Sequence, residues 1–393
     1  MKNCTKQILF ILALAMCVAC CGTRGGKRDD YRVCAWVWPS CHDDSLGRTN
    51  WEEGIGEWEV IKKGDPRYEG HYQPKRPLWG YEMDDDPAVV ERWIDTALEH
   101  GVNTFIYDWY WFDHYPYLEG ALNNGFLKAS NCRKMDFYIM WANHDVPHNY
   151  WNPHKWGDDS SILWHGAVGM DDFKLIVERV IRQYFTQPNY VKVDGCPVFA
   201  IFDLNIFADG LGGKEKAAEA IAYMRSEVRR AGFPDLHLQM VHGGVPYPSP
   251  GKIEEIKGTI DNLGVASMVG YNPGAYSSDY TQMNCGAIGI RDVWHSVLDI
   301  PVYPTVAVGW DDTPRFPKKG IDDVIHVDAT PETFRTYLQV AKEYADQNAD
   351  RQEKFIMINA WNEWVEGSYL LPDEVWGYRY LEAVKSVFVD GRR

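Results

Sequence analysis

The chain has 393 residues, of which 45% are apolar, so it can bury a large core as one elaborated α/β barrel or as two average domains. Its formal net charge of −16 argues against a nucleic-acid partner, because binding to a nucleic-acid backbone needs clustered lysines and arginines. The charge fits an exported protein with a neutral or cationic ligand, and it also fits a protein that is simply well solvated.

The first residues predict an export signal. Lys2 and Lys6 precede a short apolar run over 8–15, which is too short to span a bilayer, and small residues then lead to Cys20 and Cys21. This pattern resembles a bacterial lipoprotein signal in which Cys20, or else Cys21, is lipidated. An ordinary cleaved signal peptide is the alternative.

These features divide the chain into three parts. Residues 1–20 form the predicted lipoprotein signal and lipobox, residues 21–30 a flexible tether of glycine and charge, and residues 31–393 one folded domain. The expected location is the outer membrane, facing the periplasm or the cell surface. Contact with the membrane is predicted only through the N-terminal lipid anchor.

Eight apolar runs in the body predict β-strands. Most are nearly continuous in apolar residues, which is typical of parallel strands buried on both faces. The runs cover residues 32–38, 104–111, 136–143, 197–203, 236–242, 266–272, 302–310 and 354–361.

Amphipathic helices are predicted between these runs. Asp86 and Pro87 open the first helix and Gly101 closes it, while Thr330 and Pro331 open a later one. The predicted helices cover residues 87–100, 171–185, 214–232, 330–347 and 378–388.

The alternation of eight strands with helices predicts a (β/α)₈ TIM barrel with extended loops over 39–85 and 143–170. A doubly wound open sheet is less favoured, since no G-x-G-x-x-G turn is present. Chemistry in such barrels lies at the C-terminal ends of the strands. These ends supply most of our candidate ligand contacts: Trp38, Asp108, Trp109, Trp141, Asn143, His242, Tyr271, Trp310, Asp311, Asn362 and Trp364.

The composition adds a weaker hint about the ligand. The 17 tryptophans and 23 tyrosines are many for this length. Some of them fill the core, and others are expected to form flat platforms that stack against sugar rings, although aromatic residues dominate binding sites in general.

Cysteine and histidine give little sign of a metal or a nucleophile. The cysteines after residue 30 have no metal-binding spacing, and Cys34 with Cys41 is the most local pair that could form a disulfide. His144 and His148 are four residues apart, but Pro147 disrupts the helix that would align them. We therefore predict neither a metal nor a cofactor.

Two carboxylates follow the last predicted strand in INAWNEWVEG, residues 358–367. Glycoside cleavage typically uses a protonated and an ionised carboxyl group, and two acids in a partly dry aromatic site acquire unequal pKa values. A helical turn would place Glu363 and Glu366 on one face, at a spacing that suits retention better than inversion. Two loop glutamates in ordinary salt bridges are the alternative.

Three motifs in this order resemble the WbsX-like proteins, relatives of glycoside hydrolase family 99. They are GEWEVIKKGDPRYEGHYQPKRP (56–77), PTVAVGWDDTPR (304–315) and NAWNEWVEGSYLLPDEVWGYRYLEA (359–383). Asp312 stands where the family commonly has Asn. His71 and Tyr72, in the first motif, could line a sugar site or fix their loop. An Asp311–Arg315 ion pair could shape the rim.

The resemblance implies a barrel that cleaves α-linked glycans, α-mannosides among them, with retention. Glu363 would remove the proton of the sugar 2-hydroxyl, so that the 2-oxygen forms a 1,2-anhydro sugar, and Glu366 would be general acid and then base. A non-catalytic glycan-binding lipoprotein and a glycan-synthesis transferase are the alternatives. Export disfavours the transferase, because sugar-nucleotide donors are cytoplasmic.

Overall fold

The computed structural model describes residues 31–242, 248–272, 277–319 and 325–392. The predicted signal peptide, the predicted lipidation site Cys20 and the predicted tether lie outside these residues. From Arg32 onward the chain forms one compact unit.

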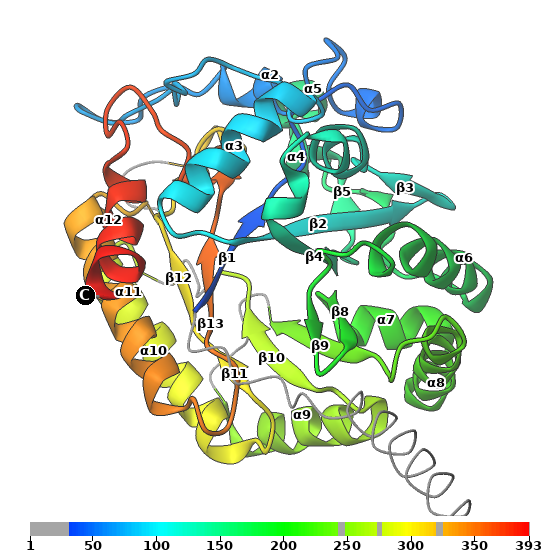
Figure 1. Ribbon diagram of the computed structural model, residues 1–393. Coiled ribbons are helices and arrows are strands. Elements are labelled where there is room, and N and C mark those ends of the chain that lie inside the picture. The colour runs from blue at the N-terminus through cyan, green and yellow to red at the C-terminus, as the bar shows by residue number, and fades with distance from the viewer. Residues whose placement is uncertain (1–30, 243–247, 273–276, 320–324, 393) are drawn as a thin grey trace, which may run out of the picture. The chain divides into compact units, whose positions relative to one another are not determined.

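Parallel strands form the centre of this unit, and helices surround them (Figure 1). The strand order is β11-β10-β9-β8-β4-β2-β1-β13-β12. The strands are β1 (Arg32–Val37), β2 (Thr104–Phe112), β4 (Asp136–Trp141), β8 (Cys196–Ile201), β9 (His237–His242), β10 (Ser267–Gly270), β11 (Val302–Tyr303), β12 (Thr305–Ala307) and β13 (Phe355–Asn359).

The seventh predicted strand, 302–310, is divided at Pro304. Its first part, β11, pairs with β10, and its second part, β12, pairs with β13. Proline has no backbone N–H to donate to a ladder, so a break at this residue is expected. Because the two parts are consecutive in the chain, they join the ends of the strand order and nearly close the sheet. The predicted (β/α)₈ barrel is confirmed.

The helices alternate with the strands as predicted, with local differences. The helix expected over 171–185 changes to a π-helical turn at Ile181–Phe185, and α7, α9 and α10 were not predicted. The main helices are α3 (Pro87–Glu99), α6 (Met170–Val180), α7 (Leu204–Leu211), α8 (Lys214–Arg230), α9 (Pro250–Leu263), α10 (Tyr280–Val297), α11 (Pro331–Gln347) and α12 (Arg379–Phe388).

Helix caps follow the predicted chemistry. The Asp86 side chain accepts a hydrogen bond from the Ala88 backbone N–H at 2.8 Å. Thr330 and Thr333 form a reciprocal capping box at the start of α11. Among the described residues, no helix is long and apolar enough to cross a membrane.

The long loops carry short elements of their own. The loop after β1 contains η1 (Gly47–Thr49) and α2 (Trp58–Ile61). The loop after β4 contains α4 (His148–Trp151) and α5 (Pro153–Trp156), with β5 (Val146–Pro147) paired to β6 (Ile162–Trp164). Smaller pieces are β3 (Tyr115–Tyr117), β7 (Lys192–Val193), η2 (Ala121–Gly125), η3 (Phe126–Lys128), η4 (Cys132–Lys134) and η6 (Asp390–Arg392).

Candidate active site

The two motif glutamates lie on a small hairpin after β13. Asn362–Glu363 (β14) pairs antiparallel with Ser368–Tyr369 (β15). Gly367 closes the turn at φ +63°, a backbone conformation that glycine adopts without strain. The chain therefore does not form the helical turn that we considered for this pair. The convergence of the two carboxyl groups has another cause.

Arg315 brings the carboxylates together. Its NH1 group donates to Glu366 Oε1 at 2.9 Å, its NH2 group lies 3.4 Å from Glu363 Oε1, and its Nε donates to Glu57 Oε1 at 2.9 Å. All four side chains are buried. One cation thus compensates three carboxylates, two of which belong to the predicted catalytic pair.

Aromatic rings enclose the guanidinium. Its central carbon lies 5.6 Å from the Trp38 ring centroid and 5.2 Å from that of Tyr150. Trp38 Nε1 also donates to Glu57 Oε2 at 2.5 Å, and Ser40 Oγ donates to the same oxygen at 3.1 Å. The rings and these hydrogen bonds fix both Arg315 and Glu57, which leaves the cluster little freedom to rearrange.

Burial changes the acidity of the pair. Burial and the neighbouring Glu366 raise the pKa of Glu363 well above its usual range. Burial raises the pKa of Glu366 to about 7, with Asp312 and Glu57 adding to the effect and Arg315 opposing it. Because both carboxyl groups resist ionisation, the pair retains a proton near neutral pH.

The glutamates open onto a cavity of about 640 Å³. Its walls are largely aromatic, as in many small-molecule sites. It is lined by Trp38, Tyr110, Met140, Ala142, His144, Asp145, Pro147, Tyr150, Trp151, Phe202, Tyr271, Asn272, Trp310, Arg315, Glu363 and Glu366. Glu366 Oε2 has no hydrogen-bond partner within the part of the chain that the structure describes.

A sequence model of the family described as "Glycosyltransferase WbsX" matches residues 33–384. This chain belongs to the WbsX family. It is also 27% identical, over 89% of its length, to the "Uncharacterized protein WxcX" of Xanthomonas campestris pv. campestris (strain B100). This chain spans about half of the length of that relative, namely 48% of it.

Solved structures share the fold. The GH99 endo-alpha-mannosidase from Bacteroides thetaiotaomicron superimposes with a TM-score of 0.57 at 13% identity, covering 92% of this chain and 97% of that one. A protein described as "Glycoside hydrolase-like protein" gives a TM-score of 0.56 at 13% identity, covering 92% and 95%. The predicted resemblance to WbsX-like and family 99 proteins is confirmed: the family model matches most of the chain, and the GH99 structure shares its fold.

Several residues that we predicted to contact the ligand lie outside the cavity. Successive residues of a strand point to opposite faces of the sheet, so only every second one faces inward. Trp109 donates to Glu119 at 2.9 Å, and Trp141 packs against Phe173 and Phe207 of the outer helices. Their neighbours Tyr110, Met140 and Ala142 line the cavity instead. A continuously apolar strand does not reveal which of its residues face inward.

Two predicted asparagines hold backbone rather than line the cavity. Asn143 bonds the backbone N–H and C=O of Asp203 at 2.8 and 2.7 Å, and Asn362 does the same for Trp38 at 2.9 and 2.7 Å. Trp364 stacks on Tyr369, with 3.9 Å between ring centroids. These side chains position the strand ends around the cavity.

Asp311 organises a buried polar cluster. Its Oδ2 lies 3.0 Å from His71 Nε2 and 3.0 Å from Lys75 Nζ, and it accepts from Gln73 Nε2 at 2.7 Å. The Asp311–Arg315 ion pair that we considered is wrong, because Arg315 pairs with the three glutamates. The Asp311 backbone N–H instead donates to the Glu366 carbonyl at 2.7 Å and so positions that residue.

The other predicted contacts lie at varying depths. Asp108 is buried and accepts from the hydroxyl of the cavity residue Tyr271 at 2.9 Å, and burial raises its pKa well above the usual range. Burial lowers the pKa of His242 to about 4. Tyr72 donates to the Arg76 carbonyl. Asp108, His242 and Tyr72 do not line the cavity, so their roles as ligand contacts remain predictions.

The prediction overlooked Glu57, Tyr150 and Trp151 and assigned Arg315 a different partner. Both Glu57 and Arg315 lie inside the motifs that carry the family resemblance, at 56–77 and 304–315. Their place in these motifs was the signal that could have identified them as site residues. The described residues contain no group of three His, Cys, Asp or Glu side chains that could hold a metal. Cys34 and Cys41 are not joined in a disulfide.

Proposed function

We propose that this protein is a glycoside hydrolase that cleaves α-linked glycans with retention through Glu363 and Glu366. One observation carries the proposal. Glu366 has one oxygen held by Arg315 and the other without a partner among the described residues, in an aromatic cavity beside Glu363. A carboxyl group that is oriented yet keeps a free oxygen is suited to protonate a leaving group.

The raised pKa of Glu366 supports its role as the acid. The base role of Glu363 requires the ionised carboxylate, which burial opposes and the Arg315 guanidinium, 3.4 Å away, favours. With a pKa of about 7, Glu366 is partly protonated at neutral pH and can donate to the glycosidic oxygen. Glu363 would take the proton of the 2-hydroxyl, whose oxygen attacks the anomeric carbon as the bond to the leaving group breaks. Water then attacks the anomeric carbon and breaks its bond to the 2-oxygen. Glu366 removes the proton of that water and Glu363 returns its proton to the 2-oxygen, which restores both groups and retains the configuration.

The family description favours a second candidate, a transferase. The same pair could pass a glycosyl group to a sugar hydroxyl instead of water. A sugar-nucleotide donor fits less well, because a diphosphate needs positive charge. Among the described lining residues, Arg315 already faces three carboxylates, and burial lowers the pKa of His144, which keeps it neutral.

A screen of the full chain against α-mannan and other α-linked glycans tests the proposal. Product with retained anomeric configuration is expected, and it should be lost in Glu363→Gln and Glu366→Gln. Glu59→Gln is a matched control, since Glu59 is buried but bonds the Glu53 backbone outside the cavity. Turnover with a sugar nucleotide alone would favour the transferase, and binding without turnover a glycan-binding protein.

Leaving-group dependence separates the two roles. An aryl α-mannoside with a strongly acidic phenol needs little protonation. Glu366→Gln should therefore keep most of kcat/KM on it, because this value reports the bond-breaking step, while losing about 10²-fold or more on glycans. Glu363→Gln should lose activity on both substrates. The opposite pattern would exchange the roles of the two glutamates.

We also propose that the protein is exported and anchored to the outer membrane by lipid on Cys20. The sequence pattern of residues 1–20 supports this. Mass spectrometry of the membrane-extracted protein should find diacylglycerol on Cys20. A Cys20→Ser variant should stay unlipidated, whereas loss only in Cys21→Ser would move the site by one residue.

A further inference from the structure

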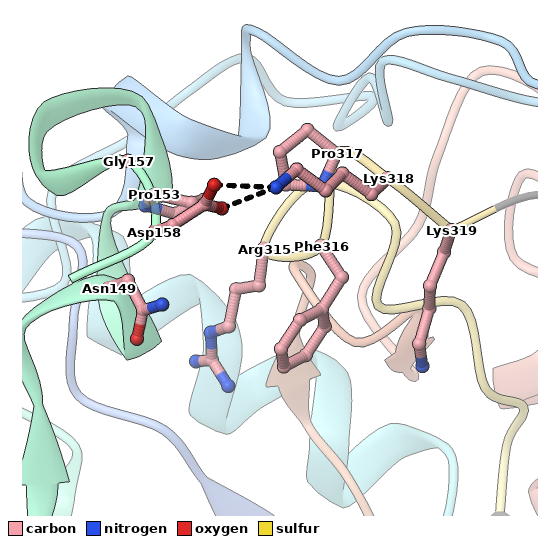
Figure 2. Close-up of a pocket in the computed structure, with 9 residues that line it drawn as sticks. All are labelled: Asn149, Pro153, Gly157, Asp158, Arg315, Phe316, Pro317, Lys318 and Lys319. Atoms are coloured by element: carbon pink, nitrogen blue, oxygen red, sulfur yellow. Dashed lines mark hydrogen bonds and ion pairs between the residues drawn. The ribbon is translucent and has the colours of Figure 1, made fainter. Parts of the chain in front are cut away.

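A second hollow of about 300 Å³ adjoins the candidate active site. Figure 2 shows the residues that line it: Asn149, Pro153, Gly157, Asp158, Arg315, Phe316, Pro317, Lys318 and Lys319. They come from the loop after β4 and from the loop after β12, at the end of the barrel where the carboxylates lie.

The two hollows share Arg315, which lines both. Helix α4 also divides its residues between them, since Asn149 lines the second hollow and Tyr150 and Trp151 line the first. Successive residues of one helical turn therefore face adjoining spaces. The shared Arg315 and the division of α4 place the second hollow directly beside the catalytic cavity.

The lining has the features of a sugar site. Phe316 is 36% exposed as a residue, and the Nζ of Lys319 lies 5.0 Å from its ring centroid. In Figure 2 Phe316 and Arg315 extend on the same side of the loop, with the Asn149 amide opposite them. The exposed Phe316 ring can stack against the apolar face of a pyranose. The Asn149 amide and the Asp158 carboxylate, which also line the hollow, can bond its hydroxyls.

The charges indicate that this sugar is uncharged. Lys318 Nζ binds both oxygens of Asp158, at 2.5 and 2.7 Å, and Lys319 Nζ binds both oxygens of Asp312, at 2.6 and 2.8 Å. Arg315 is held by its three glutamates. Among the described residues, every cation that lines the hollow is thus already compensated by carboxylate, which leaves no excess positive charge there for an acidic sugar.

We infer that the second hollow is a subsite for an uncharged sugar residue of the same glycan chain, next to the residues bound in the catalytic cavity, with Phe316 as its stacking platform. The inference rests on the proposed function and extends it: the substrate is an oligosaccharide or polysaccharide, and the enzyme recognises sugars beyond those at the cleaved bond.

The test compares substrates of different length. Steady-state kinetics are measured for α-manno- and α-gluco-oligosaccharides of two to six residues with the wild type, Phe316→Ala and Phe316→Tyr. We expect kcat/KM of the wild type to rise with length. Phe316→Ala should lower it ~5- to 10-fold for the longer substrates only, as expected for one lost stacking contact. Phe316→Tyr should restore it.

Tyr115→Ala is the matched control, because Tyr115 is an exposed aromatic residue that lines neither hollow. Equal loss on short and long substrates in Phe316→Ala, or no length dependence in the wild type, would overturn the subsite. If the wild type cleaves none of these substrates, the hydrolase proposal fails. The subsite is then tested separately, by calorimetric binding of the same oligosaccharides. Length-dependent affinity that Phe316→Ala weakens would support it, and no binding would overturn it.

Discussion

Arg315 and Glu57 form a buried ion pair between residues 258 positions apart, with 2.9 Å between Nε and Oε1. The pair aims the two terminal guanidinium nitrogens at Glu363 and Glu366. Glu57 therefore influences both the orientation of Arg315 and the acidity of the candidate catalytic acids, although it does not line the cavity.

Replacing Glu57 should shift the pH dependence of activity. Glu57→Gln removes a negative charge that raises the pKa of Glu366, so this pKa should fall below its present value of about 7. The alkaline limb of kcat/KM against pH should then move to lower pH, because the acid loses its proton earlier. An unchanged profile in a folded variant would contradict the electrostatic role of Glu57.

Replacing Arg315 should destabilise the fold. Arg315→Met leaves three buried carboxylates without their cation, and the expected loss is about 3–5 kcal/mol in the free energy of unfolding. Urea unfolding at pH 8 and pH 5 measures it. The loss should shrink at pH 5, where the carboxylates accept protons, and Arg315→Lys should lose less. A pH-independent loss would indicate a packing defect.

The wild type itself should lose stability as pH rises from about 4.5 to 7. Glu366 has a folded pKa of about 7 against a usual 4.5, so in this window the folded protein retains a proton that the unfolded chain has released. The free energy of unfolding should fall by on the order of 3 kcal/mol from this group. Glu366→Gln should flatten the slope in part, since Glu363 is shifted in the same direction. An equal slope in both proteins would contradict the raised pKa.

Gly367 should tolerate no side chain. An added Cβ would lie 2.8 Å from Asp311 Cβ, at φ +63°, next to the hydrogen bond from the Asp311 N–H to the Glu366 carbonyl. Gly367→Ala should cost about 3 kcal/mol and most activity, because strain and overpacking add. Gly377→Ala, at φ +56° with no neighbour within 4 Å, should cost about 1 kcal/mol and leave activity intact. Equal losses of stability in Gly367→Ala and Gly377→Ala would show that the contact with Asp311 Cβ adds no cost.

The sequence by itself determined the barrel and the place of the glutamates. Strands buried on both faces must be apolar along their length, so runs such as 104–111 and 354–361 identify parallel strands, and Glu363 and Glu366 follow the last of them. The capped helices at Asp86 and Thr330 are equally local, because a cap depends on neighbouring residues alone.

Only the tertiary structure decided which side chains meet. Continuous apolar runs conceal the alternation that turns Tyr110 toward the cavity and Trp109 away from it. Local spacing likewise suggested an Asp311–Arg315 pair, whereas the folded chain brings Arg315 to Glu57, Glu363 and Glu366. The reason is physical: a buried charge takes the partners that folding brings near it, and those partners come from loops far apart in the chain.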